Sequence, residues 1–397
     1  MKIYIYFLAL FYISTLHADD CSPRLGGLPS SSKERSLLEN MPNMDQGTFG
    51  ICYAHSAAFL YDHYRFSVQG QSMASGISSP LEVALSTREK ATYEDAQKTY
   101  SGGSLDYHSG VGKKIQAGKK ISMDDFVGGG AEDPLGYLVR NGSCNAFIID
   151  QLNSTETYRR AMVNLRKYYY EFQDYLKEYE AKDKGLFESV FWDSGSYYEA
   201  KERYLNPIKM CLDSTLGVWT SQYLDDEFII ELLHQASPVQ FVNDLVYARC
   251  NQERVKLNYF SSTPDVVTDR LRIDKNKSPP WMEGPEHIIK NVDDALDSNP
   301  SMPIEIAHCS KVYSRSFRTR RVHPGNTTND MWQQCGPHSA VVAGRKKINN
   351  KCYYLVINWN GGECVEKANA ICDEGTGGYW ITKQDLGNAT WQTTRLK

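Results

Sequence analysis

Several features that mark common protein classes are missing from this sequence. No Cys-x-x-Cys pair occurs, so a structural zinc site has little support. The segment 110–120 is rich in glycine and lysine but lacks the spacing and the Ser or Thr of a phosphate-binding loop. The formal net charge is only −4, so the overall charge does not favour a nucleic-acid partner.

Long hydrophobic runs are also scarce. Only residues 3–16 form an extended apolar stretch, and it is shorter than the roughly 20 residues that a membrane helix needs. Lys2 precedes this stretch and the small residue Ala18 follows it, which is the pattern of a secretory signal peptide. We therefore predict a signal peptide at 1–18 and a secreted, periplasmic or extracellular protein that has no membrane attachment after cleavage.

The chain has ten cysteines, which an oxidising compartment would allow to form disulfides. Cys364 and Cys372 are eight residues apart in a glycine-flanked loop, and we expect them to pair. If one cysteine stays reduced for catalysis, the number left is odd. At least one more cysteine is then reduced or bridges two chains.

The pattern of residues along the chain changes twice. Residues 19–45 are rich in Ser, Pro and Gly and are expected to be extended. Residues 51–68 lack Gly and Pro and have apolar residues at helical spacing, which predicts a buried helix with Cys52 in its first turn. A short helix is expected at 131–141 and a long amphipathic one at 155–182, with the helical pattern continuing to about 250.

From about residue 300 the sequence is typical of β-strands. Short β-branched and aromatic segments are separated by Gly or Asn, at 302–308, 339–347, 352–358 and 377–383. The chain is thus helical early and in the middle, and rich in strands at the end. This order predicts the α+β fold class with a helical insertion.

Cys52 is the first candidate for chemistry. A thiol attacks a carbonyl as the thiolate, which a helix N-terminus and an imidazolium neighbour both favour. The imidazole needs a third group that holds its ring, and the tetrahedral intermediate needs hydrogen-bond donors. Gln46, six residues before Cys52, could supply a donor through its side-chain amide.

A family resemblance rests on three blocks. Residues 46–56 read QGTFGICYAHS and resemble the nucleophile motif Q-G-x-C-G-S-C-W-A-F-S of the papain and cathepsin family of cysteine peptidases. CGPHSAVVAG at 335–344 resembles the histidine motif of that family, and CYYLVINWNGG at 352–362 resembles the strand that ends in N-S-W-G. The resemblance covers about 35–145 and 285–385.

The resemblance implies roles for individual residues. His338 corresponds to the general base and Asn358 to the residue that orients it, while Gln46 and the Cys52 N–H correspond to the oxyanion hole. Gly129 and Gly130 lie where the family has the backbone that pairs with an extended substrate. No metal or organic cofactor is implied, and the expected partner is a peptide or protein substrate.

The resemblance also implies a two-lobed papain-like fold. Its divisions would be a signal peptide, an N-terminal helical lobe that carries the nucleophile, a helical insertion, and a β-rich lobe that carries the His and Asn, at 1–18, 19–150, 151–285 and 286–397. The insertion would explain why Cys52 and His338 are about twice as far apart as the family's roughly 130–150 residues. Little chain precedes Cys52 for an inhibitory prosegment, so the insertion is expected to have a regulatory or docking role.

Two departures from the family pattern carry expectations. A disulfide of the family is replaced at both ends, by Phe49 and Val127, which are expected to pack together. Trp359 stands one position earlier than the family's tryptophan, which leaves open whether its indole shields the Asn358–His338 pair.

The sequence therefore predicts an exported papain-like cysteine peptidase that works through Cys52, His338 and Asn358. Two alternatives stay open. The chain could be a catalytically inactive binding protein on the same scaffold, or another Cys–His acyl-transfer enzyme such as a cell-wall peptide hydrolase or a transglutaminase-like enzyme. Gln46 before Cys52 favours the peptidase.

Overall fold

The computed structural model describes a subset of the residues, and the structural statements below concern that subset. The described residues are 21–42, 44, 46, 51–80, 82–84, 87, 130–146, 164–165, 167–175, 177, 199, 201–216, 224–235, 241, 245, 254–258, 263–271, 273–274, 281–282, 284–313, 337–359, 364 and 369–397.

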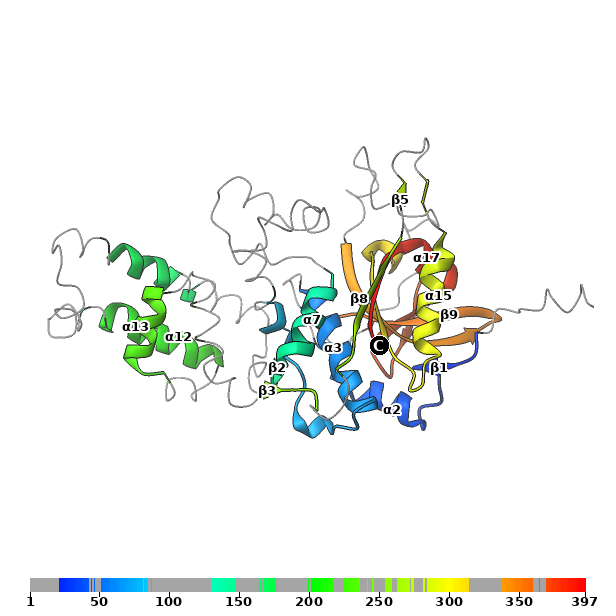
Figure 1. The fold of residues 1–397 in the computed structure, drawn as a ribbon, viewed down its shortest axis with the longest axis horizontal. Helices are drawn as coiled ribbons and strands as arrows, with labels where there is room; N and C mark the ends of the chain where they lie inside the picture. Colours follow the sequence, from blue (N-terminus) through cyan, green and yellow to red (C-terminus); the bar gives the residue numbers. More distant parts are fainter. Residues whose placement is uncertain are drawn as a thin grey trace, which may run out of the picture.

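An antiparallel sheet of eight strands forms the centre of the fold (Figure 1). Seven strands follow the order β10-β11-β9-β8-β7-β12-β4, and β1 pairs with β8 off this path. The strands are β1 (Arg24–Leu25), β4 (Val266–Arg270), β7 (Ile304–Cys309), β8 (Pro337–Ile348), β9 (Lys351–Ile357), β10 (Ile371–Asp373), β11 (Gly378–Thr382) and β12 (Thr390–Leu396). Short pairs β2–β3 and β5–β6 lie outside this sheet, at Ser143–Cys144 with Arg254–Val255 and at Ile273–Asp274 with Trp281–Met282.

A tight turn joins the two longest strands, β8 and β9. Asn349 and Asn350 both have positive φ, 48° and 60°. Two successive residues of this kind form the turn that matches the twist of a β-hairpin, and asparagine tolerates that conformation better than most residues. The turn fixes the register in which β9 returns along β8, and it therefore positions the residues at the far end of the hairpin.

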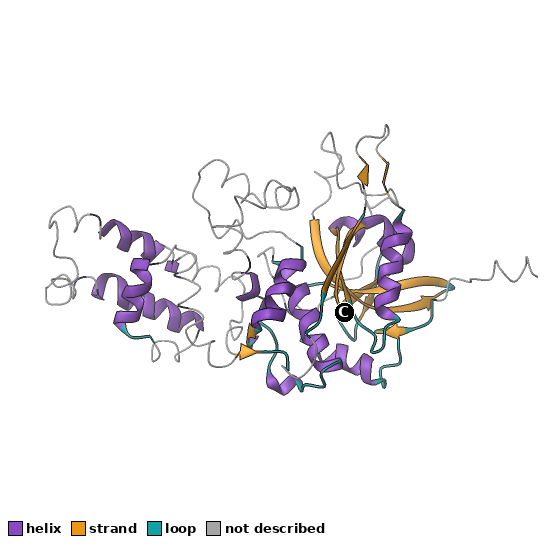
Figure 2. Cartoon of the chain, in the orientation of Figure 1, coloured by secondary structure: helices purple, strands orange, loops and turns teal. Residues whose placement is uncertain are grey.

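Helices cover the sheet in two groups, as Figures 1 and 2 show. Helix α3 (Cys52–Ser67) packs against β8 and against α7 (Glu132–Asn141), and α15 (Pro285–Leu296) packs against β12 and α17 (Lys383–Ala389). All residues of α3 from Cys52 to Phe66 are buried. Small residues such as Ala54 and Ala57 make this close packing feasible, since a helix without them could not approach its neighbours on all sides. The α+β prediction is confirmed at this level.

The described part of the middle region is mainly helical. Residues between 164 and 177 are helical, followed by a π-helical turn η4 (Lys201–Leu205), α12 (Asn206–Leu216) and α13 (Asp226–Gln235). Figure 1 shows α12 and α13 well apart from the central sheet. Two short 3₁₀ turns, η1 (Met73–Ser75) and η7 (Ser310–Tyr313), complete the described elements. None of the described helices is long and apolar enough to cross a membrane.

Two expectations from the sequence need correction. The expected extended lead-in 19–45 contains a helix, α2 (Lys33–Asn40), whose N-cap Ser32 accepts a hydrogen bond from the Arg35 N–H at 3.1 Å. Serine favours this capping position, so the composition that indicated a loop marks a helix start. The expected helical insertion 151–285 also contains strands, because β4 pairs with β12 and joins the central sheet.

The disulfides and thiols of the described residues agree with the expectations from the number and spacing of the cysteines. Cys364 and Cys372 are bonded as expected, and Cys21 is bonded to Cys352 on β9, which ties the start of the described chain to the sheet. Cys52 and Cys211 are thiols, so of the two expected possibilities, a second reduced cysteine or a bridge between chains, the structure has a second reduced cysteine. Disulfides of this kind are typical of proteins in oxidising compartments.

Candidate active site

Cys52 is the first residue of helix α3. The N-cap Ile51 makes no side-chain capping hydrogen bond, and the first turn contains no acidic residue. Only 5% of Cys52 is exposed. The partial positive charge at the helix N-terminus therefore acts on a buried sulfur that has no competing anion on its own helix turn, and it favours the thiolate.

His338 and Asn358 come from the two strands of the β8–β9 hairpin. His338 is the second residue of β8, and Asn358 directly follows β9. The pairing of Val341 with Ile357 sets the register that brings the two side chains together. His338 Nε2 and Asn358 Oδ1 are 2.6 Å apart.

A second hydrogen bond identifies which atom of the Asn358 amide faces the histidine. The backbone N–H of Trp359 donates to the same Asn358 atom at 3.0 Å, so this atom must be the oxygen. An amide oxygen only accepts, and His338 must therefore carry its proton on Nε2 when the ring is neutral. The other ring nitrogen, Nδ1, is left to interact with the Cys52 sulfur.

The surroundings of Cys52 lower the pKa of its thiol. Burial alone raises the pKa, but the charge of His338 and a hydrogen bond with that side chain outweigh it, helped by the backbone N–H groups of Ser339 and Tyr53. The Ser339 N–H lies 3.4 Å from the sulfur. The structure thus brings the Cys52 thiol, the His338 imidazole and the Asn358 amide together from distant positions in the sequence.

Gln46 lies beside this group. Its backbone N–H donates to the Trp359 carbonyl at 3.2 Å, which ties the loop before α3 to the residue after Asn358. Its side-chain Oε1 is buried and has no hydrogen-bond partner among the described residues. This oxygen is an acceptor, so donation to an oxyanion would have to come from the Nε2 group of the same amide.

The two glycines that are expected to bind substrate are only partly described. Gly130 precedes α7, and a Cβ there would lie 2.9 Å from Gln392 Nε2, so glycine allows a close approach. Gly129, like the expected Phe49–Val127 contact, lies outside the described residues.

Trp359 is buried next to the catalytic group despite its shifted position. Its indole Nε1 donates to Ser56 Oγ and to the Ser339 carbonyl, both at 3.2 Å, and its ring stacks on His55 with centroids 5.6 Å apart. Its backbone N–H also holds Asn358, as described above. The tryptophan is therefore attached to both strands that carry His338 and Asn358.

Several polar residues of this region had no role in the sequence analysis. Ser339 Oγ lies 2.9 Å from both Ser56 Oγ and Glu305 Oε1. The one sequence signal for Glu305 is a charged residue inside an otherwise apolar strand, PIEIAH. On the same strand, buried His308 packs edge-on against His338 with centroids 5.4 Å apart, and burial lowers its pKa to about 3. His308 is therefore a neutral neighbour of the catalytic ring.

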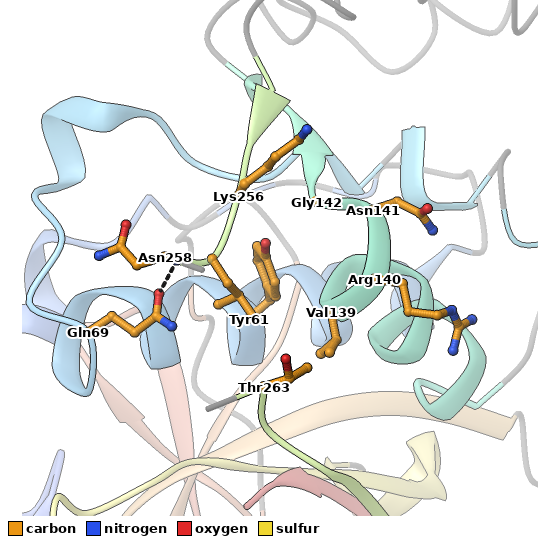
Figure 3. A pocket seen from close by; sticks show the side chains of 10 residues that line it. Tyr61, Gln69, Val139, Arg140, Asn141, Gly142, Lys256, Asn258 and Thr263 are labelled. Atoms are coloured by element: carbon orange, nitrogen blue, oxygen red, sulfur yellow. Dashed lines mark hydrogen bonds between the residues drawn. The ribbon is translucent and has the colours of Figure 1, made fainter. Parts of the chain in front are cut away.

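Two described pockets lie outside this group. One is lined by residues of α3 and α7, by residues 256–258 and by Thr263. Figure 3 shows the charged ends of Lys256 and Arg140 pointing in different directions around buried Tyr61. The other is small and apolar and lies beside Trp359 and Met44. Neither brings a nucleophile together with a base. In the described chain no three His, Cys, Asp or Glu side chains are placed to hold a metal ion.

Comparisons with known proteins find no match by sequence but do find similar solved structures. No family model matches the sequence, and no curated protein matches it. A solved structure from work on the limited antibody cross-reactivity between the mite allergens Blo t 1 and Der p 1 is similar, with a TM-score of 0.38 and 10% identity. The similarity covers 93% of this chain and 71% of that one. Because this TM-score is below 0.5, the site must be judged on its own geometry.

Proposed function

We propose that the protein is an exported papain-like cysteine peptidase that hydrolyses peptide bonds through Cys52, His338 and Asn358. One observation carries the proposal. The buried Cys52 thiol, whose pKa is lowered, interacts with an imidazole whose far nitrogen is bonded to Asn358 Oδ1 at 2.6 Å. Nucleophile, base and orienting group in this order are the requirements of acyl transfer through a thiol.

The chemistry follows from the assigned ring nitrogens. The Cys52 thiolate attacks the carbonyl carbon of a peptide bond, and the carbonyl oxygen becomes an oxyanion that the Cys52 N–H and the Gln46 amide stabilise. The tetrahedral intermediate collapses as the C–N bond breaks, and His338 Nδ1 gives its proton to the leaving amine. Water then hydrolyses the thioester, with His338 as the base that accepts its proton.

The wider features of the proposal come from the sequence. An extended peptide would lie in a cleft between a helical and a β-rich lobe, near Gly129 and Gly130. The helices of the 151–285 region would regulate access to this cleft or bind a partner. Residues 1–18 would direct the chain out of the cell, and the disulfides are compatible with that destination.

The test is to incubate the reduced, folded protein with a peptide library in H₂¹⁸O and to identify products by mass spectrometry. The proposal predicts new termini with ¹⁸O in the new carboxyl groups, and none with Cys52→Ala. Peptides that bind but stay intact would favour the inactive binding protein. Transfer of acyl groups to an added amine, without new carboxyl termini, would favour another acyl-transfer enzyme.

A further inference from the structure

A buried carboxyl group lies directly behind the nucleophile. Glu305 on β7 is 0% exposed, and its Oε1 is 2.9 Å from Ser339 Oγ. The Ser339 backbone N–H is in turn 3.4 Å from the Cys52 sulfur. A single residue, Ser339, therefore contacts both the carboxyl group and the nucleophile.

The charged groups around Glu305 leave it without a counter-ion. The charged group that acts on Glu305 is Glu132 of α7, while its hydrogen-bond donors, Ser339, Thr394 and the Ala131 backbone, are uncharged. Glu132 is in turn paired with Arg270 of β4, which also donates to Gln392 Oε1 at 2.8 Å. Ionisation of Glu305 would thus add an uncompensated negative charge behind Cys52.

The hydroxyl groups around Glu305 must follow its protonation state. Ser339 has one hydroxyl proton but two oxygen neighbours, Glu305 Oε1 and Ser56 Oγ, each at 2.9 Å. An ionised Glu305 only accepts, so Ser339 must donate to it and Ser56 must donate to Ser339. A protonated Glu305 can donate to Ser339, which reverses both bonds. The indole N–H of Trp359 donates to Ser56 in either case.

We propose that Glu305 is a positioning residue whose ionisation weakens the thiolate form of Cys52, so that the site is most reactive while Glu305 is protonated. Cys52 and His338 share one proton between a thiolate–imidazolium form and a neutral form. Glu305 is connected through Ser339 to the sulfur and not to the imidazole. Its negative charge is therefore expected to oppose the thiolate more than it favours the imidazolium, which shifts this balance toward the neutral form. This inference rests on the proposed function of Cys52, and it adds a pH response to it.

The surroundings of Glu305 place this response near neutral pH. Burial and, to a smaller extent, the charge of Glu132 raise the pKa of Glu305, and hydrogen bonds from Ser339, Thr394 and the Ala131 backbone oppose the rise, so that the resulting pKa is about 7. The contributions of Ser339 and Glu132 to the pKa of Glu305 can each be removed by a substitution. Removing the Ser339 hydroxyl should raise the pKa of Glu305, and removing the Glu132 charge should lower it.

The test is the rate of Cys52 alkylation by iodoacetamide between pH 5 and 9, followed at the Cys52 peptide by mass spectrometry. The native protein should show a step near pH 7, across which the thiolate–imidazolium fraction falls by about threefold, or half a pKa unit. Glu305→Gln, which has the same shape and is always neutral, should lack the step. Ser339→Ala should move it to higher pH and Glu132→Gln to lower pH, with near-UV circular dichroism checking the fold of each variant.

The outcomes separate this inference from the proposed function. A step that persists in Glu305→Gln, or a rate lowered by one factor at every pH, would overturn the role of Glu305. Peptide cleavage by a native protein whose alkylation profile has no such step would overturn this inference alone. A step in alkylation without any peptide cleavage would keep this inference and remove the peptidase.

Discussion

Two buried carboxyl groups at the central sheet differ in how their charge is balanced. Asp373, at the end of β10, lies 3.0 Å from the Arg35 guanidinium and accepts the indole N–H of Trp380 at the same distance. Glu305 on β7 has a hydroxyl donor in Ser339 but no lysine or arginine partner among the described residues. One carboxylate is paired as a structural group usually is, whereas the other is buried next to a nucleophile.

The difference separates structural from functional burial. An unpaired buried charge is costly, and a protein normally avoids it by pairing or by taking up a proton. Arg35 connects Asp373 to the carbonyl of Gly26 as well, so that pair joins α2, β10 and the chain start. Glu305 accepts hydrogen bonds from Ser339, Thr394 and the Ala131 backbone but has no described cation beside it, and this cost would be understandable if the group adjusts the chemistry of Cys52.

The largest effect is expected from the catalytic base. His338→Ala should lower kcat/KM for peptide cleavage by about 10²–10⁴-fold, because both proton transfers depend on this ring. His287→Ala, on partly exposed α15, is the matched control and should leave the rate unchanged. A similar loss of kcat/KM in both variants would show that the effect is not specific to the His338 side chain.

Gln46→Ala tests the oxyanion hole. It should lower kcat by about 10²–10³-fold with little change in KM, because an amide donor acts on the charge that develops in the transition state. Gln384→Ala, an exposed glutamine on α17, serves as control. An unchanged kcat would mean that the half-buried Gln46 side chain only packs against the loop.

Arg35→Ala tests the structural member of the comparison. The variant should lose about 3–5 kcal/mol of unfolding free energy in urea, because Asp373 stays buried without its cation. The alkylation rate of Cys52 per folded molecule should not change. Glu305→Gln should instead lose less unfolding free energy and should change the pH dependence of Cys52 alkylation. If both variants changed the unfolding free energy and the alkylation of Cys52 to the same extent, the difference between the two carboxyl groups would be contradicted.

The smallest effect concerns the pH dependence of stability. Burial lowers the pKa of His63 to about 3, whereas in the unfolded chain it is near 6.5. The unfolded chain therefore binds the extra proton, and the stability present above pH 6.5 is lost as pH falls toward 3, by at most about 1.4 kcal/mol per pH unit. His63→Gln should reduce this slope in urea unfolding series, and an unchanged slope would show that His63 is not neutral in the fold.

The sequence predicts the residues whose role depends on local pattern. Cys52 could be placed at a helix start, and His338 and Asn358 could be assigned to consecutive strands, because each pattern is contained in about ten residues. The role of Glu305 depends on a contact with Ser339 across two strands, which no local pattern specifies. For the same reason β4, which pairs with the last strand of the chain, was assigned to a helical region.

Covalent labelling of Cys52 tests the central claim most directly. The reduced, folded protein is treated with a peptidyl epoxide that reacts with activated thiols, and the labelled peptide is identified by mass spectrometry. If His338 activates the Cys52 thiol, the label is expected at Cys52 in the native protein, should be lost in His338→Ala, and should not appear to a comparable extent at Cys211. An unlabelled Cys52, or equal labelling with and without the His338 imidazole, would contradict it.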